Sequence, residues 1–303
     1  MNAENKKLIG PDGKELSSAK INATTRTLER NQENIDYVPV IVKRSDESKR
    51  HPDDILEKAI KEGLIQYQRP NFSLLLSAVS AGLILGFVGM CVALVSQVIP
   101  SEDNMIANRL AVAIVYPFGF IVCILSGTQL FTEHTATAVY PVLDKKTNLK
   151  SLLELWLIIL CGNFLGTFIS SFLLYSSDSV IMAKVGFVDI ANHLIHYSFG
   201  EVFLSAVLAG WLMAQGGWLL LASTSTIGQI LCIYIVTFII GLGGLHHSIA
   251  GSAEIFSGLL NSSAPEYLAS LKFLTSAVLG NLLGGSFFVG ILNYAHIKKT
   301  QYK

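Results

Sequence analysis

Two adjacent histidines, His246 and His247, lie inside one of the most apolar regions of the chain. They belong to the stretch 241–250 (GLGGLHHSIA), which interrupts a hydrophobic run from about residue 227 to residue 260. Imidazole changes its charge near neutral pH, and ionisable groups at bilayer depth are costly unless they face protein or water. The stretch therefore predicts a transmembrane helix broken in mid-membrane with both histidines at the break. The alternative is an unbroken, glycine-containing helix whose two histidines pack on a neighbour.

A second polar interruption, 127–135 (GTQLFTEHT), splits another apolar run from about residue 110 to residue 143. It contains Thr132, Glu133 and His134, and Thr132 is placed to cap the following half-helix, as Ser248 is at the other break. Paired interruptions in corresponding halves of a membrane protein point to a transporter binding site. Because a helix N-terminus carries partial positive charge and free N–H donors, two of them at the midplane favour an anion.

The charged residues are distributed very unevenly along the 303-residue chain. Residues 1–69 hold 13 of the 22 Lys and Arg residues and 12 of the 22 Asp and Glu residues, and the formal net charge is +0. A balanced charge argues against nucleic acid as the main partner. The remainder contains several apolar stretches able to cross about 30 Å of hydrocarbon, so the chain is expected to be an all-α polytopic protein in a lipid bilayer. The four cysteines show no metal-ligand spacing, and neither a metal nor a cofactor is expected.

The sequence divides into four parts. Residues 1–50 are expected to form a flexible cytoplasmic tail, 51–70 an amphipathic helix on the cytoplasmic surface (a plain solvated helix being the alternative), 71–297 a six-span transport domain, and 298–303 a cytoplasmic C-terminal tail. The predicted spans are 71–98, a broken 109–143, 151–174, 199–222, a broken 227–260, and 273–294. Six spans put both termini on one side, and the lysines of 145–150 and of the C-terminus place that side in the cytoplasm.

The two halves of the transport domain repeat each other. Each half runs intact span, broken span, intact span, and the third span of each carries a Gly-Asn motif, at Gly162-Asn163 and at Gly280-Asn281. Three spans per half force opposite orientations, which predicts a 3+3 inverted repeat. The small residues Gly162/Gly166 and Gly280/Gly284 favour close helix packing. We expect residues 130–132 to correspond to 245–247, with Thr132 and His247 facing each other.

These features resemble the formate/nitrite transporter family over about residues 55–297. The resemblance rests on Leu-Phe-Thr at 130–132, His-Ser-Ile-Ala at 247–250 and the two Gly-Asn motifs. It implies a homopentamer of aquaporin-like protomers in a bacterial inner membrane, each with a pore for small monovalent anions such as formate or nitrite. It assigns the family's central histidine to His247 and its loop threonine to Thr132. The implied apolar constrictions contain Tyr116 and Ile240 on the periplasmic side, and Phe120, Leu130 and Phe131 on the cytoplasmic side.

The sequence departs from the family at several positions. A lysine usual near the start of the fourth span falls at or near Leu194, and two asparagines are Gly210 and Gly251. Glu133 and His134 replace small polar residues. These changes predict a vestibule with a weaker attractive field for anions and fewer hydrogen-bond donors. They also predict a Glu133 that either repels anions or is paired with His134 or His246.

An anion loses much of its solvation in an apolar constriction, and neutralising it removes that cost. We therefore expect His247, hydrogen-bonded to Thr132, to donate a proton to the anion or to hold it electrostatically, so that a weak acid and a proton are the partners. A first alternative is an aquaporin-like channel for a small neutral solute, although no Asn-Pro-Ala motif lies at either break. A second is a membrane enzyme or metal site that uses Glu133, His134, His246 and His247.

Overall fold

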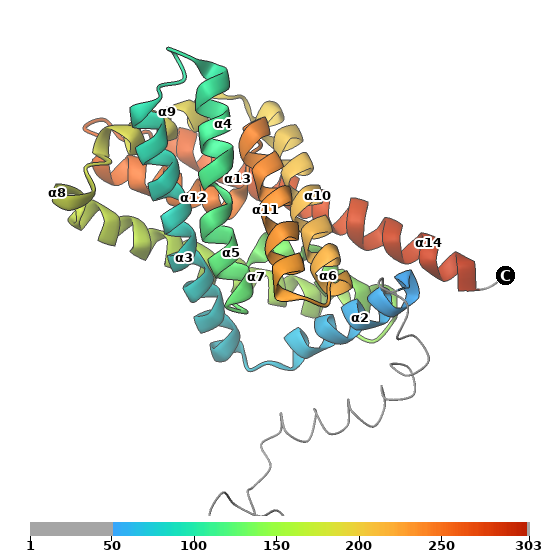
Figure 1. Ribbon diagram of the computed structural model, residues 1–303. Coiled ribbons are helices and arrows are strands. Elements are labelled where there is room, and N and C mark those ends of the chain that lie inside the picture. The colour runs from blue at the N-terminus through green and yellow to red at the C-terminus, as the bar shows by residue number, and fades with distance from the viewer. Residues whose placement is uncertain (1–50, 302–303) are drawn as a thin grey trace, which may run out of the picture. The chain divides into compact units, whose positions relative to one another are not determined.

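The computed structural model describes residues 51–301, so the predicted tail at 1–50 lies outside the described residues. This part of the chain contains helices and no strand (Figure 1). Six helical segments are long and apolar enough to cross a membrane: Asn71–Val98, Met105–Leu125, Leu149–Ser176, Phe199–Ala222, Thr226–Gly243 and Tyr267–Lys298. The all-α, six-span fold class predicted from the sequence is confirmed.

The first half begins with α2 (Pro52–Gln68) and the long α3 (Asn71–Val98). The broken span consists of α4 (Met105–Val115), α5 (Pro117–Leu125) and α6 (Phe131–Leu143), and α7 (Leu149–Ser176) returns across the bundle. Pro117 cannot donate a backbone hydrogen bond, which accounts for the interruption between α4 and α5. The loop at 126–130 separates α5 from α6, so the predicted break is present.

The second half follows two short helices, α8 (Asp178–Ile181) and α9 (Lys184–His196). The stretch 175–197, which the sequence indicates as a polar loop with one short helix, is therefore mostly helical, and α9 packs against α3 and α12. The half itself consists of α10 (Phe199–Ala222), the broken pair α11 (Thr226–Gly243) and α12 (Ser248–Asn261), and α13 (Tyr267–Leu283). A π-helical segment (Gly284–Ile291) and α14 (Leu292–Gln301) extend α13.

The intact spans of each half pack as a close pair, α3 with α7 and α10 with α13. A side chain at Gly166 would collide with the backbone of Val79 in α3, and one at Gly284 would collide with the backbone of Val207 in α10. Close approach of helix backbones requires small residues at the contact. The predicted role of these glycines is therefore confirmed in both halves.

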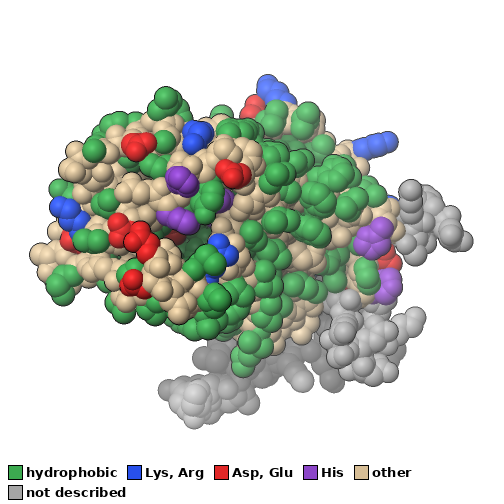
Figure 2. Space-filling model, turned by 90° about the horizontal axis from the view of Figure 1, so that it is seen from above, with side chains coloured by type: hydrophobic (Ala, Val, Ile, Leu, Met, Phe, Trp, Pro, Cys, Tyr) green, Lys and Arg blue, Asp and Glu red, His purple; other side chains and the backbone are tan. Residues whose placement is uncertain are grey.

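The amphipathic segment forms α2, which lies at the lower end of the bundle in Figure 1 and packs against α6. The Tyr67 hydroxyl donates to the carbonyl of Ala138 at 2.7 Å, and Gly63 lies against the backbone of Thr137. Buried Leu56, Ala59 and Ile60 form the apolar face of α2. Seen from above, hydrophobic side chains cover the flank of the bundle, whereas charged side chains and histidines gather on the face toward the viewer (Figure 2).

Candidate functional site

An asparagine holds the first break in place. Asn163, from the Gly-Asn motif in α7, accepts a hydrogen bond from the Phe131 N–H at 2.9 Å. Its amide donates to the carbonyls of Gln129 at 2.9 Å and Ala78 at 2.8 Å. Gly127 has a φ of +68°, a left-handed conformation that glycine adopts without strain. The side chain of Asn163 thus satisfies backbone groups that the broken helix leaves without intrahelical partners.

Asn281 does the same at the second break. It accepts from the Ser248 N–H at 2.7 Å and donates to the carbonyls of His246 at 3.0 Å and Ala206 at 2.7 Å. The same three bonds in both halves are what an inverted repeat predicts. They also correct the predicted register, because Phe131 now corresponds to Ser248, and Leu130 to His247. The expected correspondence of 130–132 with 245–247 is therefore wrong by two residues.

Neither half-helix is capped as predicted. The residue before α6 is Leu130, which has no side-chain cap, and Thr132 lies within the first turn. The residue before α12 is His247 itself, whose Nδ1 accepts from the N–H groups of Ile249 and Ala250, each at 3.2 Å. Imidazole replaces the predicted Ser248 cap because its ring nitrogen reaches both donors from the preceding position.

The side chains of Thr132 and His247 are joined across the two breaks. The Thr132 hydroxyl lies 2.7 Å from His247 Nε2, and both residues are buried. Because Nδ1 accepts two backbone N–H groups, we assign the neutral ring's proton to Nε2, which donates to the Thr132 oxygen. The Thr132 hydroxyl hydrogen then remains available to another acceptor.

Apolar side chains surround this pair. The Phe120 ring lies edge-on to the His247 ring at 5.0 Å between centroids, and the Tyr116 ring lies 5.1 Å from that of Phe120. Phe120, Leu130 and Ile240 are fully buried, and Phe131 and Tyr116 nearly so. The five residues assigned to the constrictions are therefore packed around or near the hydrogen-bonded centre.

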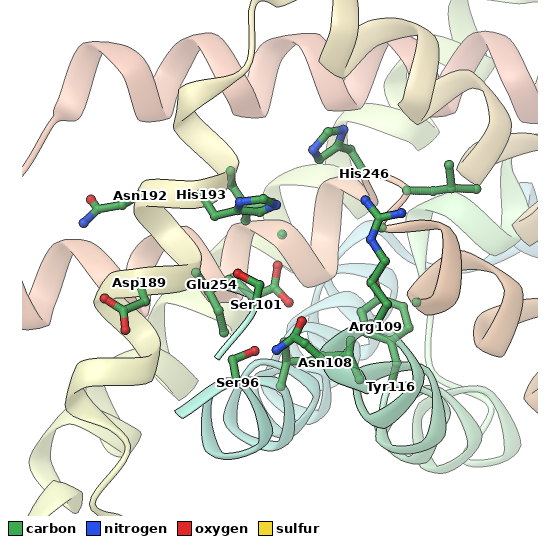
Figure 3. A pocket seen from close by; sticks show the side chains of 18 of the residues that line it. Ser96, Ser101, Asn108, Arg109, Tyr116, Asp189, Asn192, His193, His246 and Glu254 are labelled. Atoms are coloured by element: carbon green, nitrogen blue, oxygen red, sulfur yellow. The ribbon is translucent and has the colours of Figure 1, made fainter. Parts of the chain in front are cut away.

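A cavity of about 940 Å³ reaches His247 from one side of the molecule, and Figure 3 shows several of the polar side chains that line it. Tyr116, Ile240 and His247 line it, together with Arg109, His246 and Glu254. Ser205 accepts from the His246 N–H at 3.1 Å, and the His246 ring packs edge-on against Tyr197 and Phe273. His246 Nδ1 is buried and has no hydrogen-bond partner within residues 51–301.

The cavity contains a positively charged side chain that was not predicted from the sequence. Leu194, where the family's lysine is expected, lines the cavity, but so does Arg109 from α4. The region described contains no ion pair between Arg109 and a carboxylate. Burial, with the nearby charges of Arg109 and His196, lowers the pKa of His193 from its ordinary value. His193 therefore stays neutral over more of the pH range, and Arg109 supplies the lasting positive charge.

The two glycines that replace asparagines are packing positions. A side chain at Gly210 would collide with the backbone of Asn281, and one at Gly251 would lie 2.9 Å from the Phe273 ring. Gly251 lines the cavity, whereas Gly210 lies at the contact of α10 with α13. The predicted loss of vestibule donors thus applies to Gly251 and not to Gly210.

Glu133 and His134 lie apart from this cavity, at the start of α6. Glu133 Oε2 is 3.9 Å from His134 Nδ1, which is itself 3.0 Å from the carbonyl of Leu130. The ion-pair partner is therefore His134, and His246 lies on the cavity side instead. Glu133 Oε2 has no hydrogen-bond partner among the described residues. The same region contains no group of three or more His, Cys, Asp or Glu placed to hold a metal ion.

Besides Arg109, three residues of the site were given no role from the sequence. Asn163 and Asn281 belong to the two Gly-Asn motifs, in which a structural role was predicted for the glycines alone. A polar amide repeated inside two corresponding apolar spans is a signal that could have identified them. By sequence, Glu254 is compatible with a pore-side charge, with a side chain that reaches the membrane interface, or with a hydrogen bond between protomers. Its place on the cavity wall depends on how α12 packs against α9.

The comparisons with known proteins identify the family of this chain and support its fold. The formate/nitrite transporter family model matches residues 53–295, so the chain belongs to that family. Inner membrane protein YfdC of Escherichia coli is 32% identical over 247 residues, which cover 80% of this chain and 78% of that protein. Among solved structures, an FNT family ion channel superposes with a TM-score of 0.74 at 18% identity, over 80% of this chain and 99% of the other. A pentameric formate channel with formate bound gives a TM-score of 0.67 at 18% identity, over 75% and 98%.

Proposed function

We propose that this protein is a channel for small monovalent anions, or for the weak acids they form, and that its conduction is linked to protons. The observation that carries the proposal is the buried hydrogen bond between Thr132 and His247, a histidine that also lines the cavity. A buried hydroxyl hydrogen among apolar rings is a donor for one small acceptor, and the rings exclude larger or strongly hydrated solutes.

The geometry favours holding the anion over protonating it at this centre. His247 Nδ1 already accepts two backbone N–H groups, and a second ring proton would displace both. A neutral ring that donates to Thr132 strengthens the hydroxyl as a donor, because linked hydrogen bonds polarise one another. The substrate pathway is thus formed by Thr132 and His247, with Tyr116 and Ile240 above them and Phe120, Leu130 and Phe131 around them.

The assembly and location form part of the proposal. A homopentamer in the bacterial inner membrane, with both termini in the cytoplasm, accommodates the many exposed apolar side chains on the flank and the lysines near α14. The proposal assigns the protein no enzymatic activity. Mass measurement in mild detergent tests the pentamer, and a stable monomer or dimer would contradict it.

Flux into proteoliposomes tests the function. The assay compares the parent with Thr132→Val and His247→Asn, with and without a pH gradient. Asparagine is chosen for His247 because it also caps helices. The anions offered are formate, nitrite, hydrosulfide, acetate and lactate. Removal of the hydroxyl donor should lower anion flux roughly tenfold or more, the loss expected for a hydrogen bond to a charged group. Thr275→Val is the matched control, because its hydroxyl bonds only to the carbonyl of Leu271 in its own helix.

The neutral-solute alternative predicts a different outcome. Water or a small uncharged solute would pass at the same rate through the parent and Thr132→Val, and none of the five anions would be carried. That result would refute the proposed function.

A further inference from the structure

Glu254 is a buried acid whose carboxylate has no partner among the described residues. It lies on α12 seven residues after His247, which is two helical turns, or about 10 Å, further along the same side of the helix. Its side chain is 7% exposed and lines the cavity, and Figure 3 shows it directed into the pocket. In residues 51–301 its carboxylate takes part in no ion pair within 4.0 Å and in no hydrogen bond.

Packing explains how this carboxylate comes to face the cavity. A Cβ placed on Gly89 of α3 would lie 3.6 Å from Glu254 Cγ, so the stem of the glutamate rests on the α3 backbone. Because α7, α9, α3 and α13 pack against the other sides of α12, the oxygens face the cavity. A carboxylate removed from water is stabilised by a cation, by donors or by a proton. If Glu254 had a structural role, its carboxylate would be paired with a cation or with hydrogen-bond donors, and the described residues provide neither.

The groups that face the cavity around Glu254 come from several elements. The titratable and charged side chains that share the cavity with Glu254 come from three regions besides α12 itself. They are Glu102 from the loop before α4, Arg109 and Tyr116 from α4 and its end, Asp189, His193, His196 and Tyr197 from α9 and its end, and His246 and His247 from the break. From α3 only uncharged Val92 and Ser96 line it, and from α13 only Phe273. Arg109 attracts an anion into a space that also contains the carboxylate of Glu254.

Tyr116 and Ile240, which belong to the proposed constriction, line this cavity beside His247. Neutralisation is most useful before the apolar rings, where desolvation of the charge begins. His247 has no proton to give there, because its Nδ1 accepts two backbone N–H groups and its Nε2 hydrogen bonds to Thr132.

We propose that Glu254 is the proton-exchange site of the cavity, which gives its proton to a weak-acid anion before the anion enters the constriction. The O–H bond of the glutamic acid breaks as an O–H bond forms on the anion. Glu254 is left as a carboxylate and takes its next proton from cavity water. A neutral acid that arrives from the other side returns its proton to the same carboxylate. The inference rests on the proposed function, and it predicts that anion flux rises as the pH falls, because charged Glu254 repels the anion whereas neutral Glu254 donates to it.

The test compares formate influx from pH 5 to pH 8 in proteoliposomes with the parent, Glu254→Gln and Glu254→Asp. Glutamine has nearly the same shape but neither ionises nor donates an acid proton, so its flux should vary little with outside pH, whereas aspartate should restore the slope. Glu201→Gln is the control, because Glu201 is exposed and glutamine preserves its capping bond to the Ser198 N–H. A slope in Glu254→Gln equal to that of the parent would overturn the inference.

Infrared difference spectra provide a readout independent of transport. Acidification of the parent should produce a carboxylic C=O band that is absent in Glu254→Gln and shifted in Glu254→Asp. If the parent carries none of the anions, the proposed function fails, and the band still decides whether Glu254 takes up a proton. Its absence from the parent across pH 5 to 8 would overturn the inference even where anions are carried.

Discussion

Replacing Asn281 by leucine tests whether the broken helix depends on one side chain. Leucine has a similar volume but neither accepts from Ser248 nor donates to His246 and Ala206. The carbonyl of Ala206 lies within α10 and keeps its helical partner, so two buried backbone groups, the Ser248 N–H and the His246 C=O, are left unpaired. At about 1–3 kcal/mol for each unpaired group, the variant should lose roughly 2–6 kcal/mol of stability.

The inverted repeat adds a second test of this prediction, because Asn163 makes the same three bonds in the other half. Asn163→Leu likewise leaves the Phe131 N–H and the Gln129 C=O unpaired, while Ala78 keeps its partner in α3, so the same loss is expected. Thermal unfolding in detergent should show both variants lowered by a similar amount. Hydrogen exchange should rise around 245–250 in the first and around 128–133 in the second. The exposed Asn192→Leu should melt with the parent. Parent-like melting of Asn281→Leu, or a large effect at only one of the two asparagines, would refute the reasoning.

The remaining predictions concern packing, pH and charge. Gly166→Ala should prevent close packing of α3 on α7 and reduce the yield of assembled protein on size exclusion, whereas Gly200→Ala, which meets nothing within 4 Å, should not; equal yields would contradict this. Burial raises the pKa of Asp144, but hydrogen bonds from Lys146 and Tyr294 and the charges of Lys146 and Lys298 outweigh it and lower that pKa overall. Because the folded pKa is lowered, the stabilisation is complete above the unfolded value of about 3.9 and is lost as the pH falls through the folded one, so the Tm gap between the parent and Asp144→Asn should close below about pH 4. Glu133→Gln should raise anion flux at pH 7.5 if this carboxylate, whose Oε2 is buried, repels the ion; an unchanged rate would show that its charge does not reach the pathway.

Much of the architecture could be predicted from the apolar runs in the sequence. The bounds of α3 and α10 coincide with the predicted spans, because each run is flanked by a proline or a serine that also ends the helix. The last span was predicted too short, since Tyr267–Leu271 and the polar end of α14 lack the continuous hydrophobicity that marks a span. The π-helical segment at 284–291 carries no pattern of its own. It lies where Gly285 meets the side chain of Thr135, a contact between distant segments.

The candidate site was predictable in its residues but not in its bonds. Residue type alone made His247 and Thr132 conspicuous, because polar groups at such depth need a partner. The atom that caps each half-helix was not predictable, because a histidine just before a half-helix and a serine just inside it can both accept hydrogen bonds from its first N–H groups. Arg109 stands at the very start of the predicted span 109–143, and the fold of α4 over the cavity brings it beside the pathway.

Because the two half-helices are capped differently, the number of free backbone N–H donors differs between the two sides of the centre. In α12 the first N–H groups are taken by Asn281 and by His247, whereas in α6 the N–H groups of Thr132 and Glu133 have no bonding partner among the described residues. The fold is an inverted repeat, but a hydrogen-bond acceptor between the breaks has free backbone donors on the α6 side only. The energy profile of the solute is therefore uneven along the pore, and equal and opposite gradients should drive unequal fluxes.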